Sequence, residues 1–222
     1  MSGKGAPAPE SAVTRLSHYL RRLEQLRAAR VVKISSRRLG EAVGCTGAQV
    51  RKDLARFGQF GRPGIGYPVD ELAAALRRIL GTHHRWNTAL VGVGNLGSAL
   101  VRYEGFKRRG FVISCAFDRD PERIGIHVGS LAVRDVSTFG QVVRENRIRL
   151  GIIAVGAGEA QEVADMMTAA GIEGILNFAP VEINVPEGVT SYTVDLAVSL
   201  ERITYRLVHR DEEKRGTPSP AP

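Results

Sequence analysis

Three glycines follow an apolar run in the middle of the chain. They are Gly92, Gly94 and Gly97, in the spacing Gly-x-Gly-x-x-Gly. The run from Thr88 to Val93 predicts a strand, and the stretch from Leu96 to Tyr103 predicts a helix. The first glycine permits a tight turn, the second lets backbone approach a pyrophosphate, and the third lets the helix pack on the strand. In this setting the motif predicts a dinucleotide site, and the alternative is that the glycines serve helix packing only.

An acidic residue closes the strand that follows. The apolar run from Phe111 to Phe117 predicts a second strand, and Asp118 stands directly after it, 21 residues beyond Gly97. A carboxylate at this place can bind a ribose 2′-hydroxyl and would repel a 2′-phosphate. The sequence therefore favours NADH and NAD+ over their 2′-phosphorylated counterparts.

Strand and helix patterns alternate through the rest of this part of the chain. The expected elements are a strand over 150–155, a helix over 159–170, strands over 174–176 and 190–194, and a last helix marked by Leu196, Leu200, Ile203 and Leu207. Strands that alternate with helices indicate a parallel sheet and the α/β class. We therefore expect a Rossmann-like nucleotide-binding domain.

Positive charge is concentrated in the first third of the chain. The 222 residues carry a net charge of +8, and residues 1–81 hold 15 Lys and Arg against 6 Asp and Glu. The remaining residues are therefore close to neutral. This asymmetry points to a polyanionic partner for the N-terminal part, a nucleic acid or a membrane surface, with a solvated basic face as the alternative.

The basic part has the pattern of a helix-turn-helix. A leucine stripe over 16–26 predicts a first helix. Ser35 or Ser36 can cap a short second helix, and Thr46 begins a third. Thr46 and Gln49 fit a capping box, in which the glutamine side chain reaches back to the cap. Two helices joined by a glycine-containing turn form a helix-turn-helix unit.

A segment rich in glycine and proline follows the third helix. Its sequence, GQFGRPGIGYPV over 58–69, predicts a β-wing with tight turns. Asp70 is expected to cap a fourth helix. The predicted N-terminal architecture is a winged helix-turn-helix domain.

The third helix presents polar side chains opposite its apolar face of Val50, Leu54 and Phe57. Gln and Arg can bond base edges in the major groove, and Lys can contact phosphate or guanine. The predicted DNA-binding residues are Ser36, Thr46, Gln49, Arg51, Lys52, Arg56 and, on the wing, Arg62. The capping box and base readout compete for Gln49. Double-stranded DNA is favoured because the few aromatic residues make no stacking platform for single strands.

Membrane and metal-binding classes find no support in the sequence. No run approaches the ~18 apolar residues of a membrane span, and the N-terminal segment lacks the apolar core of a signal peptide. We therefore expect a cytoplasmic protein with no membrane partner. Cys45 and Cys115 make no metal pattern and are interpreted as small apolar fillers.

An enzymatic role would need a proton donor or acceptor beside the nicotinamide. Only His127 falls within the nucleotide domain, on an expected surface turn. We therefore expect no catalytic residues and no enzyme. Two alternatives stay open: a small NAD(H)-dependent oxidoreductase with a basic regulatory arm, and a CoA-binding module.

Five segments in their order resemble the Rex family of redox-sensing transcriptional repressors. They are QVRKDLARFGQFGRPGIGY, GVGNLGSALVRYEGF, FDRDPERIG, GILNFAPVEINVPEGV and VDLAVSLERITYRL, and the resemblance covers about residues 10–210. It implies a homodimer whose winged helices bind a palindromic operator when NADH is scarce, and which releases the DNA when NADH binds. It also implies that the last helix swaps across the dimer and lies between the partner's two domains.

The resemblance also assigns roles to single residues. It places Asn177, Phe178, Ala179 and Pro180 in a loop at the nicotinamide end, and Arg21, Tyr103 and Asp195 in a polar network between the domains. The full expected cofactor-binding set is Gly92, Val93, Gly94, Asn95, Leu96, Gly97, Asp118, Arg119, Val155, Asn177, Phe178, Ala179 and Pro180. The chain departs from the family pattern at Pro63 in the wing, at the segment 154–161, which lacks a proline, and at Leu196, where some members have an aromatic residue.

The expected organisation follows from these patterns. We expect disorder over 1–9, a winged-helix DNA-binding domain over 10–81 and an NAD(H)-binding domain over 82–195. A swapped helix over 196–210 and a disordered tail over 211–222 complete the chain.

Overall fold

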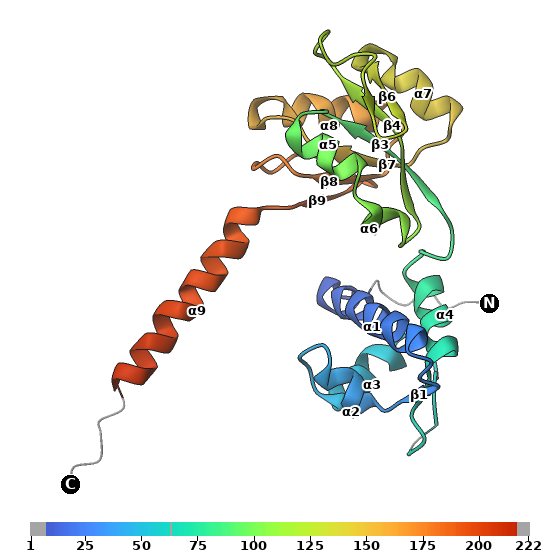
Figure 1. Cartoon of the computed structure of the whole chain (residues 1–222), viewed down its shortest axis with the longest axis vertical. Coiled ribbons are helices and arrows are strands. Elements are labelled where there is room, and N and C mark those ends of the chain that lie inside the picture. Colours follow the sequence, from blue (N-terminus) through green and yellow to red (C-terminus); the bar gives the residue numbers. More distant parts are fainter. Residues whose placement is uncertain (1–7, 63, 217–222) are drawn as a thin grey trace. The chain divides into compact units, whose positions relative to one another are not determined.

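The structure, a computed structural model, describes residues 8–62 and 64–216 (Figure 1). The chain divides into two compact units, an N-terminal unit that ends at Arg85 and a C-terminal unit that begins at Trp86. The division lies a few residues after the expected boundary at residue 81. Most of the disorder expected over 1–9 falls outside the described residues, and Glu10 begins the first helix.

The N-terminal unit combines helices with one short antiparallel sheet. Its elements are α1 (Glu10–Ala28), β1 (Lys33–Ile34), α2 (Ser36–Glu41), α3 (Gly47–Ala55), β2 (Tyr67–Pro68) and α4 (Val69–Ile79). β1 pairs with β2, and an antiparallel bridge joins Arg62 to Gly66 in the loop between α3 and β2. This loop folds back on itself, as the glycine- and proline-rich segment predicts.

Hydroxyl caps begin the two helices of the helix-turn-helix. Ser35 Oγ accepts a hydrogen bond from the amide of Arg38 at 3.2 Å, so Ser35 rather than Ser36 caps α2. Thr46 Oγ1 accepts one from the amide of Gln49 at 3.1 Å and caps α3. Each cap satisfies a backbone donor that the helix itself leaves unpaired.

The expected cap by Asp70 is wrong. α4 begins at Val69, directly after Pro68, and no side chain accepts a hydrogen bond at its start. The carboxylate of Asp70 lies in the first turn instead, where its Oδ1 is 3.1 Å from Nε of Arg27. A negative charge in the first turn still favours the helix through the helix dipole.

One apolar core holds the N-terminal unit together. Its fully buried members come mainly from α1, α2, α3 and α4, and they are Leu16, Tyr19, Leu23, Leu39, Val50, Leu54, Leu72 and Leu76. The buried residues of α1 recur at spacings of three and four, which places them on one helix face. The core therefore fixes one side of α3 and leaves Arg51 and Lys52 exposed on its other side.

The C-terminal unit is built on a seven-stranded sheet. Its strands are β3 (Trp86–Val91), β4 (Phe111–Asp118), β5 (His127–Val128), β6 (Leu131–Asp135), β7 (Leu150–Ile153), β8 (Gly174–Asn177) and β9 (Thr190–Thr193). The order in space is β5-β6-β4-β3-β7-β8-β9, and every pair except β5–β6 is parallel. The chain thus runs outward from β3 through β4, then returns to β7 on the other side of β3. In such sheets ligands bind at the carboxyl ends of the strands where the order reverses.

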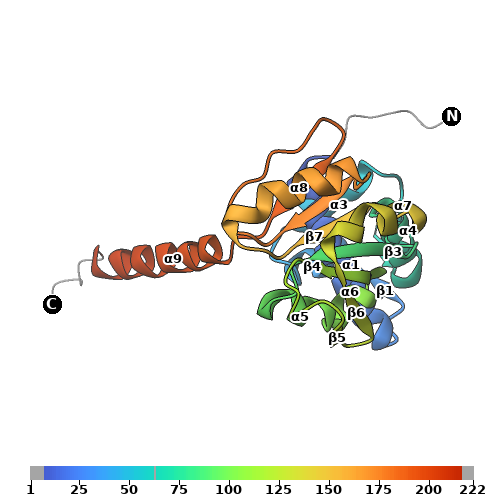
Figure 2. The same cartoon turned by 90° about the horizontal axis from the view of Figure 1, so that it is seen from above.

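Helices cover both faces of this sheet (Figure 2). They are α5 (Asn95–Val101), α6 (Glu104–Lys107), α7 (Phe139–Glu145) and α8 (Ala160–Ala169), with short 3-10 turns η1 (Val136–Thr138) and η2 (Ala157–Glu159). The helix expected over 96–103 is α5, which ends at Val101, and the unpredicted helix α6 begins after Tyr103, whose ψ is an extended 97°. The strands β5 and β6 and the helix α7 were not predicted.

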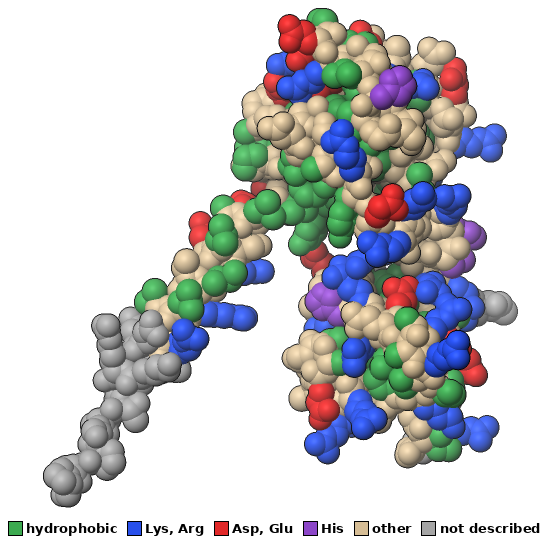
Figure 3. Space-filling model, viewed as in Figure 1, with side chains coloured by type: hydrophobic (Ala, Val, Ile, Leu, Met, Phe, Trp, Pro, Cys, Tyr) green, Lys and Arg blue, Asp and Glu red, His purple; other side chains and the backbone are tan. Residues whose placement is uncertain are grey.

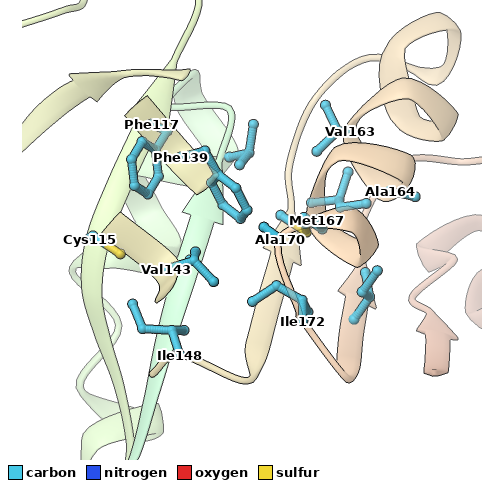
Figure 4. Close-up of a cluster of buried hydrophobic side chains, with 14 of the residues drawn as sticks. Cys115, Phe117, Phe139, Val143, Ile148, Val163, Ala164, Met167, Ala170 and Ile172 are labelled. Carbon is cyan, nitrogen blue, oxygen red and sulfur yellow. The ribbon is translucent and has the colours of Figure 1, made fainter. Parts of the chain in front are cut away.

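Two apolar clusters attach the helices to the sheet. Phe117, Phe139 and Met167 belong to the cluster that packs α7 and α8 on one face (Figure 4). Leu90 and Phe106 belong to the cluster on the α5 and α6 side. Cys115 is buried in the first cluster, as its interpretation as an apolar filler predicts.

The last helix, α9 (Leu196–Gly216), exposes its apolar side chains (Figure 3). Leu196 and Leu200 are 66% and 64% exposed, and Ile203 and Leu207 are exposed as well. Disorder was expected over 211–222; residues 211–216 continue α9 as a helix, and 217–222 lie outside the described residues. Among the described residues, no helix is long and apolar enough to cross a membrane.

Candidate nucleotide site and DNA-binding surface

Two glycines make the turn between β3 and α5 possible. Gly92 has a φ of +95°, and a Cβ at this position would lie 2.6 Å from the carbonyl oxygen of Ala154. A Cβ at Gly97 would lie 1.9 Å from the carbonyl oxygen of Gly92. The first glycine therefore allows the backbone conformation, and the second allows α5 to pack against the turn.

A pocket of about 540 Å³ opens beside this turn. Its lining comes from the carboxyl ends of β3, β4 and β7 and from the start of α8: Val91, Gly92, Gly94, Asp118, Arg119, Asp120, Arg123, Val136, Ala154, Val155, Gly156, Glu159, Glu162, Val163 and Met166. The pocket thus lies at the reversal point of the strand order. An apolar floor with charged groups at its rim is the usual composition of a small-molecule site.

Asp118 ties the glycine turn to the end of β4. The amide of Val93 donates to its Oδ2 at 2.7 Å, and the amide of Asp120 donates to its Oδ1 at 3.0 Å. Burial of this carboxyl group opposes ionisation, but the backbone hydrogen bonds from Asp120, Val93 and Arg119 and the charge of Arg123 together hold the pKa of Asp118 below its ordinary value. Oδ1 accepts from the amide of Asp120, so it keeps a lone pair with which the ionised group can accept a hydrogen bond from a ligand.

Both arginines of the pocket are bound to carboxylates. Arg123 Nη1 lies 3.5 Å from Oδ2 of Asp118, and its Nε lies 3.2 Å from Oδ2 of Asp120. Arg119 Nη2 is paired with Oε1 of Glu159. A Cβ at Gly94 would be 3.3 Å from Nη1 of Arg123, so this guanidinium lies over the glycine turn.

The pocket brings together one part of the predicted cofactor set. Gly92, Gly94, Asp118, Arg119 and Val155 line it. Val93 and Gly97 shape the turn, whereas Asn95 and Leu96 are exposed in the first turn of α5 and are not among the lining residues.

The expected nicotinamide loop does not reach this pocket. The side chain of Asn177 is buried and binds its own loop: its Nδ2 donates to the carbonyl of Val181 at 2.7 Å, and its Oδ1 accepts from the amide of Ala179 at 2.9 Å. Phe178 packs against the cluster on the α5 side. Pro180 lines a separate hollow of about 440 Å³ beside the start of α9.

Several lining residues were missed by the sequence analysis. Arg123 lies in the segment FDRDPERIG, but nothing in that segment marks its side chain as part of the pocket. Glu159, Glu162, Val163 and Met166 enter the pocket because β7 is the neighbour of β3. Their spacing along one helix face was the signal that could have found them.

The surface of α3 carries the predicted DNA contacts. Arg51, Lys52 and Arg56 are exposed, and Arg62 is exposed in the loop that leads to β2. Arg51 Nη1 donates to Oγ of Ser36 at 2.9 Å, so this arginine is held against the start of α2. Pro63, the expected departure in the wing, lies outside the described residues.

Gln49 does not form the expected capping box, and its readout of bases stays a prediction. Its Nε2 donates to Oδ1 of Asp53 at 2.8 Å, so its side chain does not reach back to the cap at Thr46. Asp53 is buried and also accepts from Arg15 Nε at 2.6 Å and from the hydroxyl of Tyr19 at 2.9 Å. The hydrogen bonds from Arg15 hold the pKa of Asp53 below its ordinary value, against the effect of burial.

The three residues of the expected polar network lie in both units. Arg21 is exposed on α1, and Tyr103 is 57% exposed with its ring edge-on to Phe106. Asp195 begins α9: its Oδ1 accepts from the amides of Ala197 at 2.8 Å and Val198 at 3.2 Å. Asp195 is therefore a helix cap, and its pairing with Arg21 or Tyr103 stays a prediction. No cluster of possible metal ligands occurs among residues 8–62 and 64–216.

Comparisons with known proteins agree with this division. The family described as CoA binding domain matches residues 83–181, and the family described as putative DNA-binding protein N-terminus matches residues 8–55. A redox-sensing transcriptional repressor Rex from Carboxydothermus hydrogenoformans is 48% identical over 204 residues, which cover 92% of this chain and 98% of the relative. The Rex protein of Desulforamulus reducens is 45% identical over 94% of this chain and 100% of its own length.

Solved structures are similar over almost the whole chain. The structure of RSP in complex with β-NAD+ and operator DNA is 37% identical, has a TM-score of 0.88 and covers 98% of this chain and 100% of that chain. RSP in complex with β-NADH is 36% identical, with a TM-score of 0.87 over 96% of this chain and 100% of that chain. RSP is itself described as a Rex-family repressor.

These similarities decide between a regulator and the oxidoreductase alternative. Identity of 48% and 45% extends through both units and leaves almost no part of either relative unmatched. The glycine turn, Asp118 and the basic helix α3 stand in the segments on which the resemblance rests. The chain belongs to the Rex family of redox-sensing transcriptional repressors, which are regulators rather than enzymes.

Proposed function

We propose that the pocket beside the glycine turn binds NADH and NAD+, and that the N-terminal unit binds operator DNA. The observation that carries this proposal is the position of Asp118, which joins the turn to β4 at the rim of a 540 Å³ pocket. The pyrophosphate would lie on the turn at Gly94, close to Arg123. The adenine would lie on the apolar floor of Val155, Val163 and Met166.

NADH is favoured over NADPH because the carboxylate of Asp118 is ionised. Its lowered pKa keeps the negative charge throughout the neutral range. This charge can accept a hydrogen bond from a 2′-hydroxyl and repels a 2′-phosphate. The two protein amides already bound to Asp118 fix its orientation, so a ligand meets a preorganised acceptor.

Asp118→Ala should weaken NADH binding by about tenfold or more, since a hydrogen bond to a charged acceptor is lost. It should also narrow the preference for NADH over NADPH. The measurement is titration calorimetry with both nucleotides, with thermal melts to follow the loss of the contact to Val93. Asp135→Ala is the matched control, because Asp135 ends the neighbouring strand β6 outside the pocket. Equal affinity of the unmodified protein for NADH and NADPH would contradict the proposal.

Coenzyme A is the second candidate ligand, favoured by the family match over residues 83–181. It shares the adenosine and pyrophosphate of NADH but carries a phosphate on the adenosine ribose. Asp118 would repel that phosphate as it would repel the 2′-phosphate of NADPH. Competition of CoA with NADH in the same titration separates the two ligands, and stronger binding of CoA would replace NADH in the proposal.

Double-stranded operator DNA is the proposed partner of α3. Arg51, Lys52 and Arg56 would reach bases and phosphates, and Arg62 would contact the adjacent backbone or minor groove. Gln49 is left out of direct readout, because Asp53 holds its amide nitrogen. The loop from 56 to 66, between α3 and β2, would then act as the wing of a winged helix-turn-helix.

A homodimer with swapped α9 helices is the proposed active form. The exposed stripe of Leu196, Leu200, Ile203 and Leu207 is a large apolar surface for a single chain. A partner subunit would cover it and place Asp195 next to a DNA-binding unit. Asp195 would then pair with Arg21 in one state and Tyr103 in the other. NADH would favour the state that releases DNA, in the cytoplasm where the genome is transcribed.

A further inference from the structure

An ion pair crosses the rim of the nucleotide pocket. Arg119 follows Asp118 at the end of β4, and Glu159 ends the η2 turn after β7. The guanidinium Nη2 of Arg119 is paired with Oε1 of Glu159, and both residues line the pocket. The pair therefore joins the two strand ends between which the adenosine would lie.

The second arginine of the pocket is engaged in the same manner. Arg123 lies within ion-pair distance of Asp118 and Asp120. The pocket thus contains two arginines and four carboxylates, those of Asp118, Asp120, Glu159 and Glu162. Both guanidinium groups are therefore already partly engaged by carboxylates of the pocket.

An arginine beside the ribose has a known chemical consequence in this fold. It can accommodate the 2′-phosphate of NADP, because a guanidinium binds phosphate through two parallel hydrogen bonds. Arg119 stands next to the proposed ribose ligand Asp118, so an unpaired guanidinium at this position could bind a 2′-phosphate. In the structure Glu159 occupies it.

We propose that Glu159 is a specificity-determining residue for the nucleotide. By holding Arg119 it engages the cation beside Asp118 that could otherwise receive a 2′-phosphate. This inference rests on the proposed binding of NADH in the same pocket. Two residues would then set the preference for NADH over NADPH. Asp118 binds the ribose 2′-hydroxyl, and Glu159 keeps Arg119 from binding a 2′-phosphate.

A purely structural role for the pair makes a different prediction. If Glu159 only holds the loop after β7 in place, its loss changes NADH and NADPH binding by the same factor. The ratio of the two affinities therefore reports on selectivity and is insensitive to a general loosening of the pocket.

The test measures the affinities of the full chain for NADH and NADPH in four proteins. Glu159→Gln frees Arg119 and should lower the NADH-to-NADPH affinity ratio by about tenfold, the value of one charge-assisted contact to phosphate. Glu159→Gln combined with Arg119→Ala should return the ratio most of the way to that of the unmodified protein. Glu173→Gln is the matched control: it breaks the similar surface pair with Arg149, whose Nη2 is 2.5 Å from Oε2 of Glu173, outside the pocket.

The outcomes separate this inference from the function on which it rests. A ratio unchanged in Glu159→Gln, with NADH still bound by the unmodified protein, overturns the role of Glu159 and leaves the NADH site intact. A gain for NADPH that persists without Arg119 also overturns it, because bulk charge would then be the cause. No NADH binding by the unmodified protein overturns both. The gain should shrink in high salt, since the new contact is electrostatic.

Discussion

At the scale of single residues, two buried carboxylates organise the two units. Asp118 joins the glycine turn to β4, and Asp53 joins α3 to α1 through Arg15 and Tyr19. Each carboxylate is ionised in a buried place because hydrogen-bond donors surround it. Asp118 keeps acceptor capacity toward the pocket, whereas the contacts of Asp53 all lie within its own unit.

Asp53→Asn should destabilise the N-terminal unit by about 2 kcal/mol at neutral pH, because Arg15 and Tyr19 lose a charged partner. The folded pKa of Asp53 is lower than its unfolded value. Its contribution is therefore complete above the ordinary Asp pKa of about 4 and is lost as the pH falls toward the folded pKa. Denaturant unfolding from neutral to acidic pH should show the difference between the two proteins shrinking with acidification.

Asp70→Asn is the control for this experiment. Asp70 also pairs with an arginine, Arg27, but its side chain is 78% exposed. Its loss should change the stability little, as for most exposed ion pairs. Equal losses in the two variants, or a difference that does not depend on pH, would contradict the account of Asp53.

Residue types were easier to predict than side-chain partners. The sequence identified Asp118 as a candidate ribose ligand because a strand pattern ends there. It identified the helix caps because residues with hydroxyl groups precede the helices. It did not show that Asp53 binds Arg15, since these two residues are 38 positions apart in the chain and meet only through the packing of α1 and α3. The pairing of Arg119 with Glu159 depends in the same way on β4 and β7 lying on either side of β3.

At the scale of elements, the helix α9 leaves its apolar side chains uncovered. Every described side chain of this helix from Leu196 to residue 210 is exposed. The spacing of its apolar residues predicted a helix with one apolar face. It did not predict which surface covers that face, because periodicity carries no information on the partner. The proposed dimer supplies the missing surface.

Leu200→Lys should weaken the dimer by at least about tenfold, because a charge would be buried in an apolar contact. Sedimentation of the full chain over a range of concentrations measures this directly. Glu201→Lys is the matched control, since it introduces the same side chain beside Leu200 but off the apolar stripe. A monomeric unmodified protein, or equal effects of both changes, would count against a role for this stripe in assembly.

Long apolar runs made most elements of the sheet predictable. β3, β4, β7, β8 and β9 lie within a residue or two of their expected positions. The strands β5 and β6 are short and half exposed, so they have no such run. The helix α6 was missed because its four residues are too few to show a helical period.

At the scale of the whole molecule, the two units carry different charges and different sites. The excess of positive charge lies in the N-terminal unit, and the pocket lies in the C-terminal unit. A ligand can act on a distant site only through different affinities for two states of the protein. NADH and DNA must therefore favour different states, and each must weaken the binding of the other by the same factor.

The most direct test is a titration of a labelled palindromic operator duplex with the full chain, with and without NADH. The account predicts tight binding without NADH and binding weakened by at least about fivefold with saturating NADH, the lower end of usual coupling between sites. Asp118→Ala should bind the duplex but respond only at higher NADH concentrations. DNA affinity that is the same with and without saturating NADH would contradict the account.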